Sequence, residues 1–139
     1  MSDAIDSYEL REGAPSTETF RHLRTSAGMS DRSAEAVALA LPHTWYGVVV
    51  HQGREPVGMG RIIGDGGTAF QITDICVLPA HQGRGLGKRI LAALTAELER
   101  RAPATAYVSL IADGEAHRLY RQFGFTETAP ASVGMARTI

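Results

Sequence analysis

The sequence has little cysteine and no excess charge of either sign, and each shortage excludes a class of protein. A single cysteine in 139 residues excludes an internal disulfide framework and a cysteine-rich zinc site. Lysine and arginine number 14 against 15 aspartates and glutamates, and a net charge of −1 argues against a dedicated nucleic-acid-binding protein. No apolar run approaches the roughly 20 residues of a membrane-spanning helix, and the acidic start lacks the apolar core of a secretory signal.

The histidines also lack the spacing of a metal site, because no two of them stand four residues apart and none has a matching carboxylate. They occur at positions 22, 43, 51, 81 and 117. With 44% hydrophobic residues, a chain of this length builds a core without disulfides or metals. We therefore expect one cytoplasmic domain over residues 1–139, with no metal, nucleic-acid or membrane partner.

The hydrophobic pattern predicts a mixed α/β fold, with a sheet of six or seven strands and about four helices on its faces. The expected order is β-α-α-β-β-β-α-β-α-β-β. The strands are expected at 6–12, 45–51, 56–63, 68–78, 106–112, 125–128 and 133–138, and the helices at 14–27, 30–41, 85–102 and 115–122. The strand–helix–strand run over 68–112 requires a parallel pair joined by a right-handed crossover.

A glycine-rich run, Gln82-Gly83-Arg84-Gly85-Leu86-Gly87-Lys88, lies between a strand and the most strongly amphipathic helix. The first N–H groups of a helix have no partner within it, and the helix dipole adds a partial positive charge there. Glycines let the backbone curl around a phosphate, and Arg84 and Lys88 add full charges. The run therefore favours binding of a phosphate-bearing ligand.

The spacing of this run decides which phosphate motif it matches. It fails the dinucleotide pattern G-x-G-x-x-G, and it fails the Walker A pattern because Gln82 and Arg89 stand at required positions. It matches Q/R-x-x-G-x-G, is preceded by Val77-Leu78-Pro79, and is followed by Leu119-Tyr120-x-x-Phe123-Gly124-Phe125. In these features the sequence resembles the GNAT superfamily of N-acetyltransferases.

The resemblance implies a transferase that uses acetyl-CoA as cosubstrate. It assigns the coenzyme pyrophosphate to the Gln82–Lys88 run and the pantetheine arm to the backbone of Ile75, Cys76 and Val77. It also implies a bulge in that strand and a splayed gap between it and the strand at 106–112. Tyr120 matches the family's general acid, which protonates the leaving thiolate. The alternative for Tyr120 is a structural tyrosine packed against the sheet.

Two aspartates carry open alternatives. Alternation along the strand puts Asp74 on the same face as Ile72 and Cys76. Its carboxylate either takes a proton from the acceptor amine, holds the ammonium in place, or makes a strand-end hydrogen bond. Asp113 stands where many family members carry an asparagine that bonds to the cofactor. It either contacts the cofactor or caps the helix that follows.

The acceptor is expected to be a small primary amine that attacks the thioester directly through a tetrahedral intermediate. Trp45 and Phe70, with Asp74, are candidates for an aromatic acceptor pocket, although ordinary core packing is the alternative for both rings. The segments at 74–77, 82–88, 108–113 and 134–135 are similar to the serotonin N-acetyltransferase-like subgroup, which suggests an arylalkylamine. The helices at 15–41 occupy the region that covers the acceptor in this family, with Met29 and Arg32 as candidates for specificity.

Three alternatives stay open at this level. Cys76 is either a nucleophile or a core residue. The chain is either a small-amine acetyltransferase or one that acts on protein lysines or N-termini. The third alternative is that the chain is not an enzyme but a non-catalytic acyl-CoA-binding or sensor module. A homodimer formed through the edge of the final strands is also expected.

Overall fold

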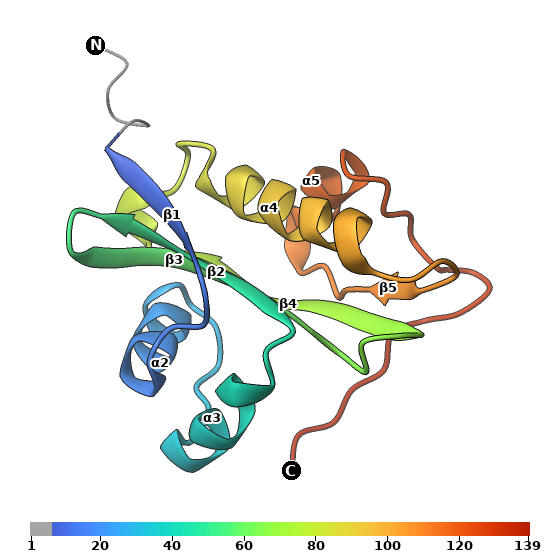
Figure 1. The fold of residues 1–139 in the computed structure, drawn as a ribbon, viewed down its shortest axis with the longest axis horizontal. Coiled ribbons are helices and arrows are strands. Elements are labelled where there is room, and N and C mark those ends of the chain that lie inside the picture. The colour runs from blue at the N-terminus through green and yellow to red at the C-terminus, as the bar shows by residue number, and fades with distance from the viewer. Residues whose placement is uncertain (1–6) are drawn as a thin grey trace.

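A five-stranded mixed sheet forms the centre of the computed structural model, which describes residues 7–139 (Figure 1). Its strands lie in chain order: β1 (Tyr8–Glu12), β2 (Tyr46–Gln52), β3 (Glu55–Gly64), β4 (Ala69–Val77) and β5 (Tyr107–Ser109). The first four pair antiparallel, and β5 pairs parallel to β4. The mixed α/β prediction is therefore confirmed. The first residue of the strand expected at 6–12 lies outside the described residues.

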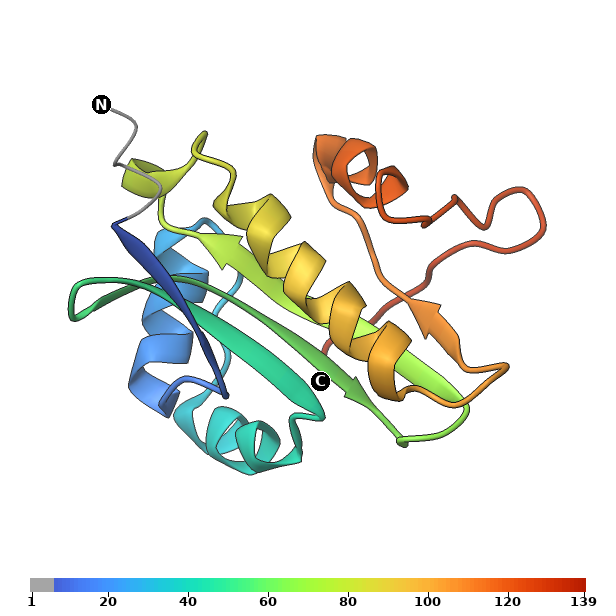
Figure 2. The same ribbon diagram turned by 45° about the horizontal axis from the view of Figure 1, so that its top comes forward.

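Helices cover both faces of the sheet. Helices α2 (Thr17–Ser26) and α3 (Ala34–Ala40) lie on one face, and α4 (Leu86–Arg101) lies on the other, with α5 (His117–Arg121) beside it (Figures 1 and 2). Helix α3 begins four residues later than the sequence predicts. Ser33 caps it by accepting a hydrogen bond from the Ala36 amide. Among the described residues, no helix combines the length and the apolar character needed to cross a bilayer.

The two layers of helices bury two apolar clusters. Under α4, the leucine stripe packs on the inner residues of the sheet; the buried members on the helix are Leu86, Ile90, Leu91, Leu94 and Leu98. On the opposite face, α2 and α3 bury Phe20, Leu23 and Val37 against β3 and β4. At Gly60 in β3, a Cβ atom would lie 2.6 Å from Cγ2 of Ile90. Helix α4 therefore packs directly on the β3 backbone at this point.

The sheet ends at β5, so the closing strand pair predicted at 125–128 and 133–138 is wrong. Within residues 126–139 the backbone forms a turn, in which the Ser132 amide bonds to the Thr128 carbonyl at 3.1 Å, and no strand. Pro130 removes a ladder donor from this segment. Its large apolar side chains are few and are left exposed; they are Val133, Met135 and Ile139. The segment therefore buries no apolar face of the kind that stabilises a strand.

Candidate functional site

A cleft of about 1040 Å³ opens where β4 and β5 separate. Residues Ala69–Gln71 of β4 pair with Tyr107–Ser109 of β5, and beyond these residues the two segments diverge (Figure 2). One wall is the second half of β4, and the facing wall runs from Ile111 to Tyr120. A third side comes from the end of α2 and the connection to α3. The splayed gap implied by the family resemblance is therefore confirmed.

Strand β4 carries a bulge at Asp74. Thr73 pairs with Arg61 and Cys76 pairs with Met59, so Asp74 and Ile75 together oppose the single residue Gly60. Asp74 adopts φ 61°, a left-handed conformation that is uncommon for any residue other than glycine. The implied bulge is confirmed.

The bulge changes which face each side chain occupies. Ile72 packs in the cluster under α4, whereas Cys76 packs with Phe20 on the α2 face. The Asp74 carboxylate also lies on the α2 face, because it pairs with Arg24 of α2. The expectation that Asp74 shares a face with both Ile72 and Cys76 is therefore wrong for Ile72. One extra residue in a strand reverses the alternation beyond it.

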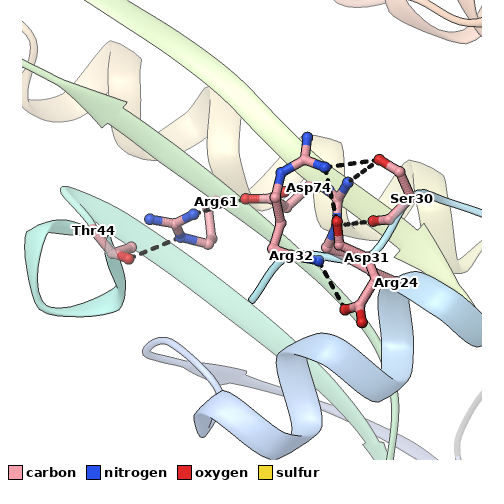
Figure 3. Close-up of polar contacts among 7 residues, drawn as sticks. All are labelled: Arg24, Ser30, Asp31, Arg32, Thr44, Arg61 and Asp74. Carbon is pink, nitrogen blue, oxygen red and sulfur yellow. Dashed lines mark hydrogen bonds and ion pairs between the residues drawn. The ribbon is translucent and has the colours of Figure 1, made fainter. Parts of the chain in front are cut away.

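Two buried arginines hold the Asp74 carboxylate (Figure 3). Nη1 of Arg24 donates to Oδ1 at 2.7 Å, and Nη1 of Arg61 donates to Oδ2 at 2.7 Å. The side chains of these arginines are each 6% exposed and that of Asp74 is 8% exposed. Arg61 also donates through Nε to Oγ1 of Thr44, and both guanidinium groups lie over the ring of Phe20. Both carboxylate oxygens are thus engaged in charge-assisted hydrogen bonds.

Sequence reasoning missed Arg24 and Arg61 as partners of Asp74. A signal was present in each case, because Arg24 shares the buried stripe of α2 with Phe20 and Leu23. Arg61 stands in the buried middle of β3, where the residues around it are glycine or apolar. A charged residue at a buried position requires a partner of opposite charge. For Arg24 that partner is Asp74, 50 residues further along the chain, so no local pattern connects the two.

Tyr120 lies on the wall facing the bulge. Its side chain is half-buried on α5 and lines the cleft together with Asp113. Burial raises the pKa of the Tyr120 phenol, and the negative charge of Asp113 raises it further. The phenol therefore keeps its proton at neutral pH, as a proton donor must. Asp113 stands at the N-cap position of the short 3-10 helix Gly114–Ala116, one of the two alternatives, but its side chain makes no capping hydrogen bond there.

The glycine-rich run forms the turn that leads into α4. Gly83 has φ 77° and Gly85 has φ 80°, so both positions need a residue that accepts left-handed geometry. The first intrahelical bond runs from the Arg89 amide to the Gly85 carbonyl at 3.1 Å, so the amides of 86–88 precede it. Arg84 and Lys88 are exposed beside them, whereas the side chain of Leu86 is buried in the core.

Gln82 joins this turn to the cleft. Its Nε2 donates to the Val77 carbonyl at 2.9 Å, and its side chain lines the cleft with Ile75, Cys76 and Val77. The contact fixes the start of the turn to the end of β4. A run of amides suited to an anion therefore continues directly into the cleft wall.

Trp45 and Phe70 lie away from the cleft. Their rings pack edge to face at 4.7 Å, and the guanidinium of Arg101 stacks on Trp45 at 4.0 Å. Phe70 belongs to the core under α4 and Trp45 packs against it. The structure thus puts both rings in core packing, on the α4 side of the sheet.

Comparison with known proteins shows the family to which the chain belongs. The acetyltransferase (GNAT) domain family matches residues 43–127. The structure also resembles a probable acetyltransferase from methicillin-resistant Staphylococcus aureus, with a TM-score of 0.91 and 39% identity, covering 95% of this chain and 99% of that one. The chain belongs to the GNAT family, and it is an acyltransferase.

Two relatives known by sequence agree with this assignment. An uncharacterized N-acetyltransferase, ycf52, from Porphyra purpurea is 29% identical over 135 residues, which make up 94% of this chain and 71% of the relative. Serotonin N-acetyltransferase 2, chloroplastic, from Oryza sativa subsp. japonica is 35% identical over 81 residues, or 58% of this chain. That match takes in 40% of the rice protein.

Proposed function

We propose that this chain transfers the acetyl group of acetyl-CoA to a primary amine by direct attack through a tetrahedral intermediate. The observation that carries the proposal is the cleft itself. It has the backbone of the β4 bulge on one wall and the protonated phenol of Tyr120 on the other. Acetyl-CoA supplies the activated acyl group. The resemblance to the rice enzyme supports a small and aromatic acceptor.

The residues present fit the cosubstrate. The amides of 83–88 form a diphosphate cradle at the N-terminus of α4, with Arg84 and Lys88 beside it. The pantetheine arm follows Ile75, Cys76 and Val77, which line the cleft beyond Gln82. A backbone N–H at the bulge receives the developing oxyanion, and Tyr120 protonates the leaving thiolate.

For Asp74 we propose a positioning role rather than that of a general base. Both of its oxygens already accept hydrogen bonds from guanidinium groups, so neither is free to take a proton from an amine. The same bonds offset the cost of the left-handed backbone at Asp74. The two arginines thus hold the bulge, and the bulge sets the direction of the amide groups that face the thioester.

Gly85→Ala tests the cradle. Alanine at φ 80° costs about 1 kcal/mol of backbone strain and tilts the amides at the start of α4. We expect the KM for acetyl-CoA to rise about tenfold, with a smaller change in kcat at saturation. Gly53→Ala is the control, because Gly53 also has positive φ and open space around it, but lies in the β2–β3 turn. An equal rise in KM for both variants would argue against the cradle.

Cys76→Ala tests whether the reaction proceeds through an acyl-cysteine. Burial raises the pKa of the Cys76 thiol to about 12, with the Asp74 carboxylate adding to the effect. A thiol with this pKa carries almost no thiolate at neutral pH and is a poor nucleophile. We expect the variant to keep kcat within about threefold of the wild type in steady-state assays. Loss of turnover in a folded variant would instead favour covalent catalysis.

The proposed function is tested by thiol release from acetyl-CoA in the presence of arylalkylamines, polyamines, amino acids, aminoglycosides and peptides. Release that depends on a small amine supports the proposal. Release with peptides alone would favour a protein acetyltransferase. Coenzyme A binding without any release would favour a sensor module. The cytoplasmic location and the homodimer stay predictions, and the final strands invoked for the dimer are not formed among residues 126–139.

A further inference from the structure

We infer that the acceptor amine carries a second, anionic group, a carboxylate or a phosphate, which binds at Arg32 and Ser30. The inference rests on the proposed function and names the class of acceptor. It starts from the charges that line the cleft. Arg24 and Arg32 stand on the side formed by α2 and its connection to α3, Asp74 lies on β4, and Asp113 lies on the facing wall.

The aspartates on the α2 side of the cleft are already paired. Asp74 is held between Arg24 and Arg61. Asp31 accepts two hydrogen bonds from Arg21, at 2.9 and 3.2 Å. Arg21, Arg24 and Arg61 share these two carboxylates, and the Arg32 guanidinium pairs with neither of them, so this group of six side chains carries an excess of positive charge.

Arg32 carries the exposed part of this excess. Its Nη1 donates to Oγ of Ser30 at 2.8 Å and to the carbonyl of Asp31 at 3.1 Å, both of them neutral acceptors. Among residues 7–139, no carboxylate forms an ion pair with its guanidinium. The edge formed by Nε and Nη2 is thus available for a planar anion, the arrangement in which arginine binds carboxylate or phosphate bidentately.

Ser30 adds a third donor to this edge. Its Oγ accepts from Nη1 of Arg32 and from Nη2 of Arg24, the latter at 3.3 Å (Figure 3). With both of its acceptor positions used, the hydroxyl has its own O–H left to donate. The Ser30 hydroxyl and the free edge of Arg32 therefore both offer hydrogen-bond donors for an anion at the same rim of the cleft.

Asp113 places a negative charge on the wall of the cleft that faces Arg32. It lies across from Arg32, beside Tyr120, and its carboxylate is exposed. A molecule with an ammonium group and an anionic group fits this pair of walls, with its nitrogen toward Tyr120 and its anion toward Arg32. The cradle for the cosubstrate lies at the start of α4, so Arg84 and Lys88, rather than Arg32, stand beside the diphosphate.

The test compares matched acceptors with and without the anion, and the Arg32 variants separate binding of the anion from any difference in amine basicity. We would measure kcat/KM for phenylalanine against phenylalaninamide, and for glucosamine 6-phosphate against glucosamine, in wild type, Arg32→Gln and Arg32→Lys. Arg11→Gln on β1 is the control, since Arg11 is an exposed arginine outside the cleft lining. The first pair reports a carboxylate and the second a phosphate.

In the wild type, one anionic acceptor is expected to exceed its neutral partner about tenfold in kcat/KM. The preference falls to near one in Arg32→Gln, through KM rather than kcat, and is partly restored in Arg32→Lys. The KM for acetyl-CoA stays unchanged in Arg32→Gln, and the control Arg11→Gln keeps the wild-type preference between the two acceptors. Neutral amines acetylated as well as anionic ones, or a preference that survives Arg32→Gln, would overturn the inference alone. No transfer to any amine would overturn the proposed function and this inference with it.

Discussion

Tyr120→Phe is expected to lower kcat by about two orders of magnitude while leaving the affinity for acetyl-CoA unchanged. Loss of a positioned general acid typically costs a factor of 10² or more. The phenyl ring keeps the packing of Tyr120 against Phe125, so the fold is retained. Steady-state kinetics and calorimetric titration with coenzyme A measure the two effects separately.

Tyr107→Phe is the matched control for this substitution. Tyr107 is 61% exposed on β5 and does not line the cleft, so its variant keeps wild-type turnover. A Tyr120→Phe variant with wild-type kcat would remove the general acid from the mechanism and leave Tyr120 a packing residue.

If Tyr120 is the general acid, kcat depends on pH in a defined direction. A general acid works in its protonated form, so its contribution is lost as pH rises through its pKa in the folded protein. Burial and Asp113 put the pKa of Tyr120 above its ordinary value of about 10. The kcat of the wild type should therefore show no decline due to Tyr120 below about pH 10. A kcat profile with an alkaline midpoint below this value that disappears in the phenylalanine variant would contradict the direction of the shift.

Asp74→Asn is expected to have the largest effect on stability, about 3 kcal/mol in the free energy of unfolding. Removing one partner of a buried ion pair typically costs about 3–5 kcal/mol, because the remaining charge is left buried without compensation. Here two guanidinium groups, each 6% exposed, lose their common partner. Asparagine accepts the left-handed backbone, so the change removes the charge without adding strain. Urea unfolding followed by circular dichroism measures the loss.

Asp31→Asn is the control for the loss of an ion pair, because it removes the aspartate of the exposed ion pair between Arg21 and Asp31. The side chains of Arg21 and Asp31 are 38% and 49% exposed, and ion pairs exposed to solvent contribute little to stability. In Asp74→Asn, kcat should fall together with stability and the shape of the kcat/KM pH profile should stay the same. A fully stable Asp74→Asn protein that has lost turnover and the acidic limb of its pH profile would show that Asp74 is a base.

The sequence predicted best those features that depend on neighbouring residues. The apolar stripe from Leu86 to Leu98 fixed the long helix to within a residue at each end, since all five stripe positions face the core. Gly83 and Gly85 were identified as turn residues, and both have positive φ. Helical periodicity and glycine conformation are local properties, which explains why they can be inferred from short segments.

Features that depend on distant contacts were out of reach. Period-two alternation cannot reveal a bulge, so the face of Asp74 relative to Ile72 was predicted incorrectly. Its partners Arg24 and Arg61 come from other elements, and no local pattern pairs them. The tail beyond Phe125 has alternating residues typical of strands, but strand formation needs a neighbouring edge and a buried face, which it lacks.

Gly60 of β3 lies in contact with both α4 and the bulge of β4. It is the single residue opposite the bulge, and its missing side chain is what allows Ile90 of α4 to rest on β3. Helix α4, which begins at the proposed phosphate cradle, thus packs on the residue of β3 that lies opposite the bulge. A methyl group at Gly60 would lie 2.6 Å from Ile90 of α4 and 3.2 Å from Ile75 of the bulge, so a displacement of either one would be transmitted to the other.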